Sequence, residues 1–400
     1  MVKWLSPLII ALPVALLGQF LGWHAYIIFV LALIALVPLA AIIGHYTEDL
    51  GEYLGDVVGG LLDATFGNAP EIIIGLLLII GVFPVVNALD IVKALIIGSI
   101  VSNVLLVLGS SVLAGAFRNG RMSFSPDRAG SYASMLALAV AGLALPALAV
   151  FLGNGENFKL TDPADKIHLS VVVSIVLLVS YAAYLGATIF HVGERPHPPR
   201  KALAVASETG DAGEANDEAS EPHLSDEDSK EQKDRERRRA LRKGKGRHIA
   251  TDIVILLVAT GLTVAASIVL VSQMNTVIVR TSLTPFFVGF ILLPFICNVV
   301  EQLGAITAAF GNHMEETMAI AAGSSVQMAL LVAPVLMLAS LALGNPLTLV
   351  FGKTELIIVS LVTFVFALVG LDGESTWLEG LQLVAFYAMV VATAYFFPGA

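Results

Sequence analysis

The chain has 400 residues, of which 57% are hydrophobic and only 14% are charged. Soluble domains average about 25% charged residues, so the composition excludes an ordinary soluble globular protein. The formal net charge of -10 says little about partners, because most charges lie in one hydrophilic segment and a few loops. The single cysteine, Cys297, excludes an intramolecular disulfide framework and a cysteine-based metal cage.

Nearly uncharged windows of about twenty residues recur along the chain, and each is long enough to cross a hydrocarbon core of about 30 Å. Hydropathy predicts an all-α, polytopic integral membrane protein with about eleven transmembrane helices. The first apolar run has no small-residue cleavage site and is expected to be a retained helix. The expected spans are 6–22, 24–44, 62–82, 91–117, 130–152, 168–191, 249–271, 284–309, 316–341, 347–370 and 376–396.

Lysine and arginine are distributed unevenly between the two ends of these spans. Most of them fall on one side, namely Lys3, Arg118, Arg121, Arg128 and the cluster 235–247, against Lys159, Lys166 and Arg280 on the other. Under the positive-inside rule the N-terminus is expected in the cytoplasm and, with an odd number of spans, the C-terminus outside.

A hydrophilic segment over 192–248 separates the two apolar parts. It is acidic from Glu208 to Asp228 and basic from Arg235 to Arg247, and it cannot bury enough apolar surface to fold compactly. We expect a solvated cytoplasmic linker; the alternative is an electrostatic element that concentrates cations and lies on anionic lipid. The expected division is an N-terminal transmembrane helix (1–23), a first five-helix repeat (24–191), the linker (192–248) and a second five-helix repeat (249–400).

Matching motifs relate the two apolar parts. Asn68-Ala69-Pro70-Glu71 in the third expected span corresponds to Asn298-Val299-Val300-Glu301 in the eighth. Further along, a second set matches at one constant offset: Asn87, Asp90, Gly98 and Ser99 with Asn312, Glu315, Gly323 and Ser324. Because an odd number of spans separates the two copies, they enter the membrane with opposite polarity. The sequence therefore predicts an inverted repeat, with a substrate site near the midplane between the halves.

Glu71 and Glu301 lie inside expected spans, where a carboxylate costs roughly 2.5 to 3.5 kcal/mol on insertion scales. Each follows an asparagine by three residues, which brings amide and carboxylate oxygens to the same side of a helix. Such oxygens suit hard cations such as Ca²⁺. Without metal, burial and mutual repulsion favour the protonated carboxyls. We therefore expect a site at which Ca²⁺ and protons compete for the two glutamates.

Other polar side chains near the motifs are candidate metal ligands. Besides Asn68 and Asn298 they are Ser99, Ser102, Asn103, Ser324 and Gln327. Bulky amides in apolar spans, such as Asn103 and Gln327, favour a site role. Ser325 and Ser111 have the alternative explanation that small residues let membrane helices pack closely.

Helix breaks are expected beside both glutamates. Gly67 and Pro70 bracket the first motif, and Pro294 precedes the second. Gly and Pro interrupt membrane helices and free backbone carbonyls that can serve as ligands. Asp63, two helical turns before Glu71, is expected to line the cytoplasmic access path or to lie at the membrane entry.

At these motifs the sequence resembles the calcium/proton antiporters of the cation/calcium exchanger superfamily. The run Leu61-Leu62-Asp63-Ala64-Thr65-Phe66-Gly67-Asn68-Ala69-Pro70-Glu71-Ile72-Ile73 is similar to the first signature of that family, and 98–109 to its continuation. The runs 298–301, 312–315 and 323–327 are together similar to the second signature. The resemblance covers about residues 24 to 396.

The resemblance implies a core of two inverted five-helix repeats plus an extra N-terminal helix, with Glu71 and Glu301 as the carriers of Ca²⁺ and protons. It also implies Ca²⁺/H⁺ antiport driven by a proton gradient, with no cofactor and no catalysed reaction. Three residues depart from the family pattern: Asp63 where asparagine is more frequent, Cys297 where glycine is usual, and Gln302 where histidine often follows the glutamate.

The nearest alternatives share this fold: a Na⁺/Ca²⁺ exchanger, or an exchanger that prefers another divalent cation such as Mn²⁺. The second half lacks a Gly-Thr-Ser-x-Pro-Glu run, which argues against sodium exchange. An intramembrane enzyme would need a zinc, paired-aspartate or serine-histidine constellation in the bilayer, and the sequence has none. A passive channel could use the same glutamates, but inverted halves favour alternating access.

The expected partners are Ca²⁺, protons and the lipid bilayer. No nucleic acid is expected, and a homo-oligomer is an open alternative. The short segment before the first span favours a prokaryotic cytoplasmic membrane, with a vacuolar membrane as the alternative.

Overall fold

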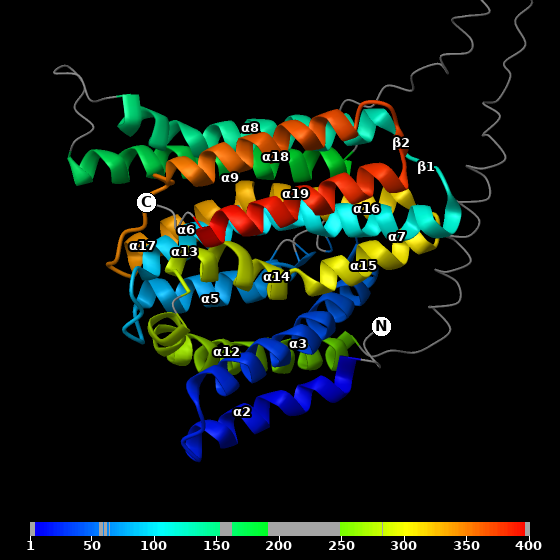
Figure 1. Cartoon of the computed structure of the whole chain (residues 1–400). Coiled ribbons are helices and arrows are strands. Elements are labelled where there is room, and N and C mark those ends of the chain that lie inside the picture. Colours follow the sequence, from blue (N-terminus) through cyan, green and yellow to red (C-terminus); the bar gives the residue numbers. More distant parts are fainter. Residues whose placement is uncertain are drawn as a thin grey trace, which may run out of the picture.

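The computed structural model describes residues 5–55, 59, 62, 63, 65–152, 162–190, 249–281 and 283–396, and helices make up nearly all of this part (Figure 1). The first half contains η1 (Ser6–Ile10), α2 (Ala11–Phe20), α3 (Ala25–Leu54), α5 (Ala69–Ile80), α6 (Ala88–Ser102), η2 (Asn103–Val107), α7 (Leu108–Asn119), β1 (Met122–Ser123), α8 (Pro126–Leu152) and α9 (Pro163–Phe190). The second half contains α12 (Ile249–Thr281), α13 (Pro285–Phe287), η3 (Val288–Leu292), α14 (Leu293–Cys297), α15 (Val299–Phe310), α16 (Met314–Gln327), η4 (Met328–Val332), α17 (Ala333–Ala342), α18 (Lys353–Val369), β2 (Glu374–Ser375) and α19 (Trp377–Phe396). The linker expected over 192–248 lies outside the described residues, and the division into four parts stays a prediction.

Every expected span overlaps a helix or a run of consecutive helices. Within the described part, seven helical stretches are long and apolar enough to cross a membrane, and the bent pair 285–297 and 299–310 adds an eighth if it counts as one span. The helices in three other expected spans, Pro7–Phe20, α5 and α18, are shorter. The polytopic all-α class is therefore confirmed, whereas the expected number of about eleven spans is not.

The outer helices expose apolar side chains, as helices in contact with lipid do. Leu138 of α8, Val179 of α9 and Leu257 of α12 are 70%, 63% and 60% exposed. Exposed apolar surface on this scale marks contact with membrane or with another protein. The helices also run along a common direction (Figure 1), with α2, α3 and α12 on one face and α8, α9 and α18 on the opposite face. Between these faces lie α5, α6, α7, α14, α15, α16 and α19.

The stretch formed by α6, η2 and α7 is the core of the molecule, with 89% of its most apolar window buried. It touches the second half backbone to backbone at Gly98, where an added Cβ would collide with the backbone of Phe290 in η3. Gly289 makes the reciprocal approach, since its Cβ would lie 2.6 Å from the carbonyl oxygen of Ile91. Glycine at both positions lets the two halves meet closely.

Local backbone geometry matches between the two halves. Asn87 and Asn312, which correspond in the sequence repeat, have φ angles of 53° and 61° and are the non-glycine residues with positive φ in the described part. The π-helical segments η2 and η4 begin at Asn103 and Met328, each four residues after one of the corresponding serines, Ser99 and Ser324. Such π segments occur frequently at functional sites.

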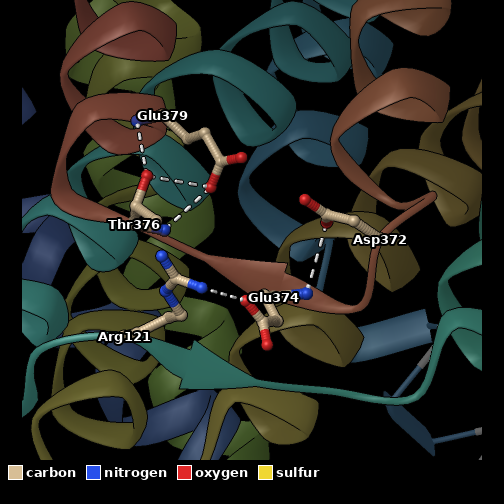
Figure 2. Close-up of polar contacts among 5 residues, drawn as sticks. All are labelled: Arg121, Asp372, Glu374, Thr376 and Glu379. Carbon is tan, nitrogen blue, oxygen red and sulfur yellow. Dashed lines mark hydrogen bonds and ion pairs between the residues drawn. The ribbon is translucent and has the colours of Figure 1, made fainter.

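A small strand pair closes the end of the helices that leads into and out of the linker, which we call the linker end. β1 follows α7, β2 precedes α19, and the two strands pair antiparallel. Figure 2 shows the polar contacts around them: Arg121 Nη1 lies 2.9 Å from Glu374 Oε2, and the Thr376 N–H donates to Glu379 Oε2 at 2.7 Å. The strand pairing and the Arg121–Glu374 contact join the α7–α8 connection to the α18–α19 connection, and the Thr376–Glu379 bond lies at the start of α19.

Substitution of Arg121 by Gln is expected to change stability little, because Arg121 and Glu374 are 69% and 49% exposed. Exposed ion pairs contribute about 0 to 1 kcal/mol, and salt screens them. Thermal unfolding of the purified chain in detergent should shift by a few degrees at most in low salt, and less in high salt. A large, salt-independent shift would instead mean that this pair holds the linker end together.

Candidate metal site

Both glutamates lie in the first turn of a helix that begins after a break. Glu71 is the third residue of α5 and Glu301 the third residue of α15, and Asn68 and Asn298 stand immediately before these helices. The two asparagines have similar backbone angles, φ -101° and ψ 24° against φ -88° and ψ 11°. The helices on either side of Asn298 are bent by 49°. The predicted break is therefore present at both motifs.

Hydrogen bonds cross between the halves at these breaks. The Asn68 amide nitrogen donates to Gln327 Oε1 at 2.8 Å, and the Asn298 amide nitrogen lies 3.5 Å from the Ser99 carbonyl oxygen. Asn103 Nδ2 donates to Ser324 Oγ at 2.9 Å. Each Asn-x-x-Glu motif therefore contacts the second motif of the opposite half, and the structure brings the candidate residues of both halves to one place.

Most of these side chains are shielded from solvent. Glu71 is 1% exposed, while Glu301 and Gln327 are partly exposed. The other candidates are buried: Asn68, Asn298, Ser99, Ser102, Asn103 and Ser324. The site thus has one deeply buried carboxylate and one that is closer to solvent.

Several buried oxygens at this place have no hydrogen-bond donor in the described part of the chain. They are Glu71 Oε2, Glu301 Oε2, Ser99 Oγ and Asn103 Oδ1. Buried polar atoms in native proteins nearly always have a partner, and a ligand or an ordered water would give these oxygens of the two halves one. A cation or a proton on the carboxylates would do so.

The chemistry of the donor set favours a hard cation. Glu71 and Glu301 interact electrostatically with one another, and Cys297 lies within range of both. Within the described residues no group of three or more His, Cys, Asp or Glu side chains could hold a metal. Amide, hydroxyl and backbone oxygens would therefore complete the coordination, as they do in calcium sites.

Ser102 and Gln302 each contact a further helix. Ser102 is buried with the other candidates, but its hydroxyl lies beside Tyr387 of α19, a neighbour that the sequence motifs did not indicate. Gln302, which departs from the family pattern, donates from Nε2 to Ser110 Oγ of α7 at 3.3 Å. It therefore helps to hold α15 against α7.

The comparisons of this sequence with known proteins agree on one family. A sequence profile described as sodium/calcium exchanger protein matches residues 24–190 and 251–396. A Ca(2+)/H(+) antiporter of Aphanothece halophytica is 34% identical over 390 residues, which cover 98% of this chain and 95% of that protein. A vacuolar calcium ion transporter of Schizosaccharomyces pombe is 28% identical and aligns with 100% of this chain and 86% of its own length.

Solved structures agree with the sequence matches. The structure of native YfkE superposes with a TM-score of 0.74 at 25% identity, over 98% of this chain and 99% of that one. The resemblance read from the two motifs is thus confirmed over nearly the whole chain. The chain belongs to the sodium/calcium exchanger protein family, and within it to the relatives of the calcium/proton antiporters.

Proposed function

We propose that this protein is a secondary antiporter that exchanges Ca²⁺ for H⁺ across a membrane by alternating access. The observation that carries the proposal is the pair of matched glutamates, Glu71 and Glu301, each with a buried carboxylate oxygen that has no donor in the described part of the chain. The name of the 34% identical relative, a Ca(2+)/H(+) antiporter, agrees with this activity. No catalysed reaction and no resident cofactor are part of the proposal.

Competition between the two ions follows from charge balance at the site. Two carboxylates buried side by side are costly unless a dication or protons neutralise them. Ca²⁺ would be held by Glu71 and Glu301 together with oxygens from Asn68, Asn298, Ser99, Ser102, Asn103, Ser324 and Gln327. Protons bound to the same two carboxylates leave no charge for Ca²⁺ to balance. One cargo therefore has to leave before the other binds.

Alternating access requires that the site opens first to one side of the membrane and then to the other. The left-handed asparagines, the π segments and the helix breaks at matching positions support two inverted five-helix repeats preceded by an extra N-terminal helix. The crosswise hydrogen bonds of Asn68 and Asn298 support one site shared by both repeats. In this arrangement either half can move against the other about a fixed site.

The proposed location is a prokaryotic cytoplasmic membrane, with the linker end in the cytoplasm. Identity to relatives does not separate the two membranes, because the antiporter of Aphanothece halophytica is 34% identical and a vacuolar cation/proton exchanger of Arabidopsis thaliana is 32% identical. The excess of Lys and Arg at the linker end supports this orientation. The vacuolar membrane is the alternative.

A second candidate, Na⁺/Ca²⁺ exchange on the same site, is favoured by the description of the matching family profile. Reconstituted liposomes distinguish the two candidates. With an imposed pH gradient and no sodium, radioactive Ca²⁺ should accumulate in liposomes that contain the native chain, and a protonophore should abolish this uptake. Uptake that requires a sodium gradient and ignores pH would assign the chain to the second candidate. Excess Mn²⁺ in the same assay tests whether another divalent cation is preferred.

A further inference from the structure

Asp63 is an exposed carboxylate on the linker-end side of the site, five residues before the break at Asn68. Its Oδ2 accepts a hydrogen bond of 3.1 Å from Gln327 Nε2, while Gln327 Oε1 accepts the bond of 2.8 Å from Asn68. One amide side chain thus connects a carboxylate in contact with solvent to the residue that begins the Glu71 helix.

Asp63 is close enough to the site to interact with one of its carboxylates, and the corresponding position of the other half is not acidic. Asp63 interacts electrostatically with Glu301 and with Tyr181 of α9. The corresponding position before Asn298 is occupied by Leu293, which is buried. In the described part of the chain no Lys, Arg or His forms an ion pair with Asp63 that would neutralise it. At this pair of corresponding positions, therefore, only the linker-end side of the site carries a carboxylate.

We infer that Asp63 is a cation-recruiting carboxylate for the linker-end approach to the site, positioned by Gln327. The inference deepens the proposed function and rests on it. A negative charge near the mouth of a site raises the local concentration of cations and their rate of entry. Because Asp63 is exposed, it can meet a hydrated Ca²⁺ before Glu301 and Glu71 bind it. The asymmetry predicts different apparent affinities for Ca²⁺ on the two sides of the membrane.

The test compares Asp63→Asn with the native full-length chain in vesicles of both orientations, sorted by whether added trypsin reaches the Lys- and Arg-rich segment 235–247. Asparagine keeps the size of the side chain and an oxygen that can accept from Gln327, and removes only the charge. We expect the KM for Ca²⁺ presented at the linker end to rise roughly three- to tenfold, with the maximal rate unchanged. The KM for Ca²⁺ presented at the other end should stay as in the native chain, which also shows that the variant is folded.

Two further variants test whether the effect is specific to Asp63 and to the linker end. Asp90 is also an exposed carboxylate, but it pairs with Lys93 at 3.3 Å and lines a cavity of about 730 Å³ at the opposite end of α6. Asp90→Asn should leave the linker-end KM unchanged. Gln327→Leu should raise KM from both sides, because Gln327 also contacts Asn68 within the site.

The possible outcomes separate the inference from the proposed function. If the native chain performs proton-driven exchange and Asp63→Asn leaves the linker-end KM unchanged, the inference is wrong and the antiporter proposal stands. A KM that rises equally from both sides also overturns the inference, because Asp63 would then act within the site. If the native chain performs no exchange, the proposed function fails, and the inference fails with it.

Discussion

Glu71→Gln and Glu301→Gln are each expected to abolish proton-driven Ca²⁺ uptake in liposomes. Glutamine preserves the size of the side chain, but it carries no negative charge to balance Ca²⁺ and no carboxyl proton to exchange. Removing one partner of a buried charge pair typically costs about 3 to 5 kcal/mol, which corresponds to more than a hundredfold in affinity. Uptake should therefore fall to the level of empty liposomes at any Ca²⁺ concentration that the native chain transports.

Glu355→Gln is the matched control for these two variants. Glu355 is a buried carboxylate near the start of α18, where its Oε2 accepts from the backbone N–H of Gly352, away from the candidate site. Its substitution removes a buried carboxylate without touching the proposed ligands, so exchange should persist. Normal exchange by Glu71→Gln or Glu301→Gln would show that the site has been placed wrongly. Loss of exchange in all three would mean that any buried carboxylate is needed for folding or transport.

The second large effect is expected from Gly98→Ala. The added methyl group would collide with the backbone of Phe290 in η3, and a backbone cannot turn aside as the end of a long side chain can. Overpacking of this kind costs about 1 to 3 kcal/mol and occasionally more. We expect a thermal unfolding midpoint several degrees lower in detergent, and slower exchange because α6 carries Ser99 and Ser102.

Gly261→Ala provides the comparison for this variant. Gly261 is an exposed glycine within α12, and beyond its chain neighbours and the adjacent backbone of its own helix no described atom lies within 4 Å of the position that its Cβ would take. Alanine is a better helix former than glycine by roughly 1 kcal/mol, so this substitution should keep or raise the unfolding midpoint. An unchanged midpoint for Gly98→Ala would mean that α6 and η3 can separate without cost, and the close contact of Gly98 with Phe290 would then not stabilise the fold.

Patterns that are local in the sequence determined much of this protein. Long apolar windows predict membrane helices because a backbone in hydrocarbon must satisfy its hydrogen bonds within each segment. Gly67, Pro70 and Pro294 predict breaks because these residues disrupt the helical backbone over a few residues. The paired Asn-x-x-Glu motifs predict the site, since a carboxylate inside a span is costly and needs a compensating role.

Hydropathy predicts about eleven spans, whereas seven or eight helical stretches of the described part are long and apolar enough to cross a membrane. Hydropathy predicts a span over 62–82, and within it the described residues 62, 63, 65 and 66 are helical before the break at Gly67 and Asn68, with α5 (Ala69–Ile80) after it. An apolar composition specifies that a segment can enter a membrane. It does not specify how long each continuous helix is, because Gly and Pro interrupt a helix inside an apolar segment without changing its hydropathy.

Only the tertiary structure decided which atoms meet. Asn68 and Gln327 lie 259 residues apart in the chain, and the bond of Gln327 to Asp63 spans 264 residues. No local pattern shows that Ser102 lies beside Tyr387. Gly98 and Gly323 correspond in the sequence repeat, yet of the two only Gly98 has the backbone of another helix where its Cβ would lie. Sequence thus determined the helices, the breaks and the buried charges, because these follow from hydrogen bonding and solvation along one segment. Packing between distant segments decided which oxygens remain unpaired and which end of the site carries the extra charge.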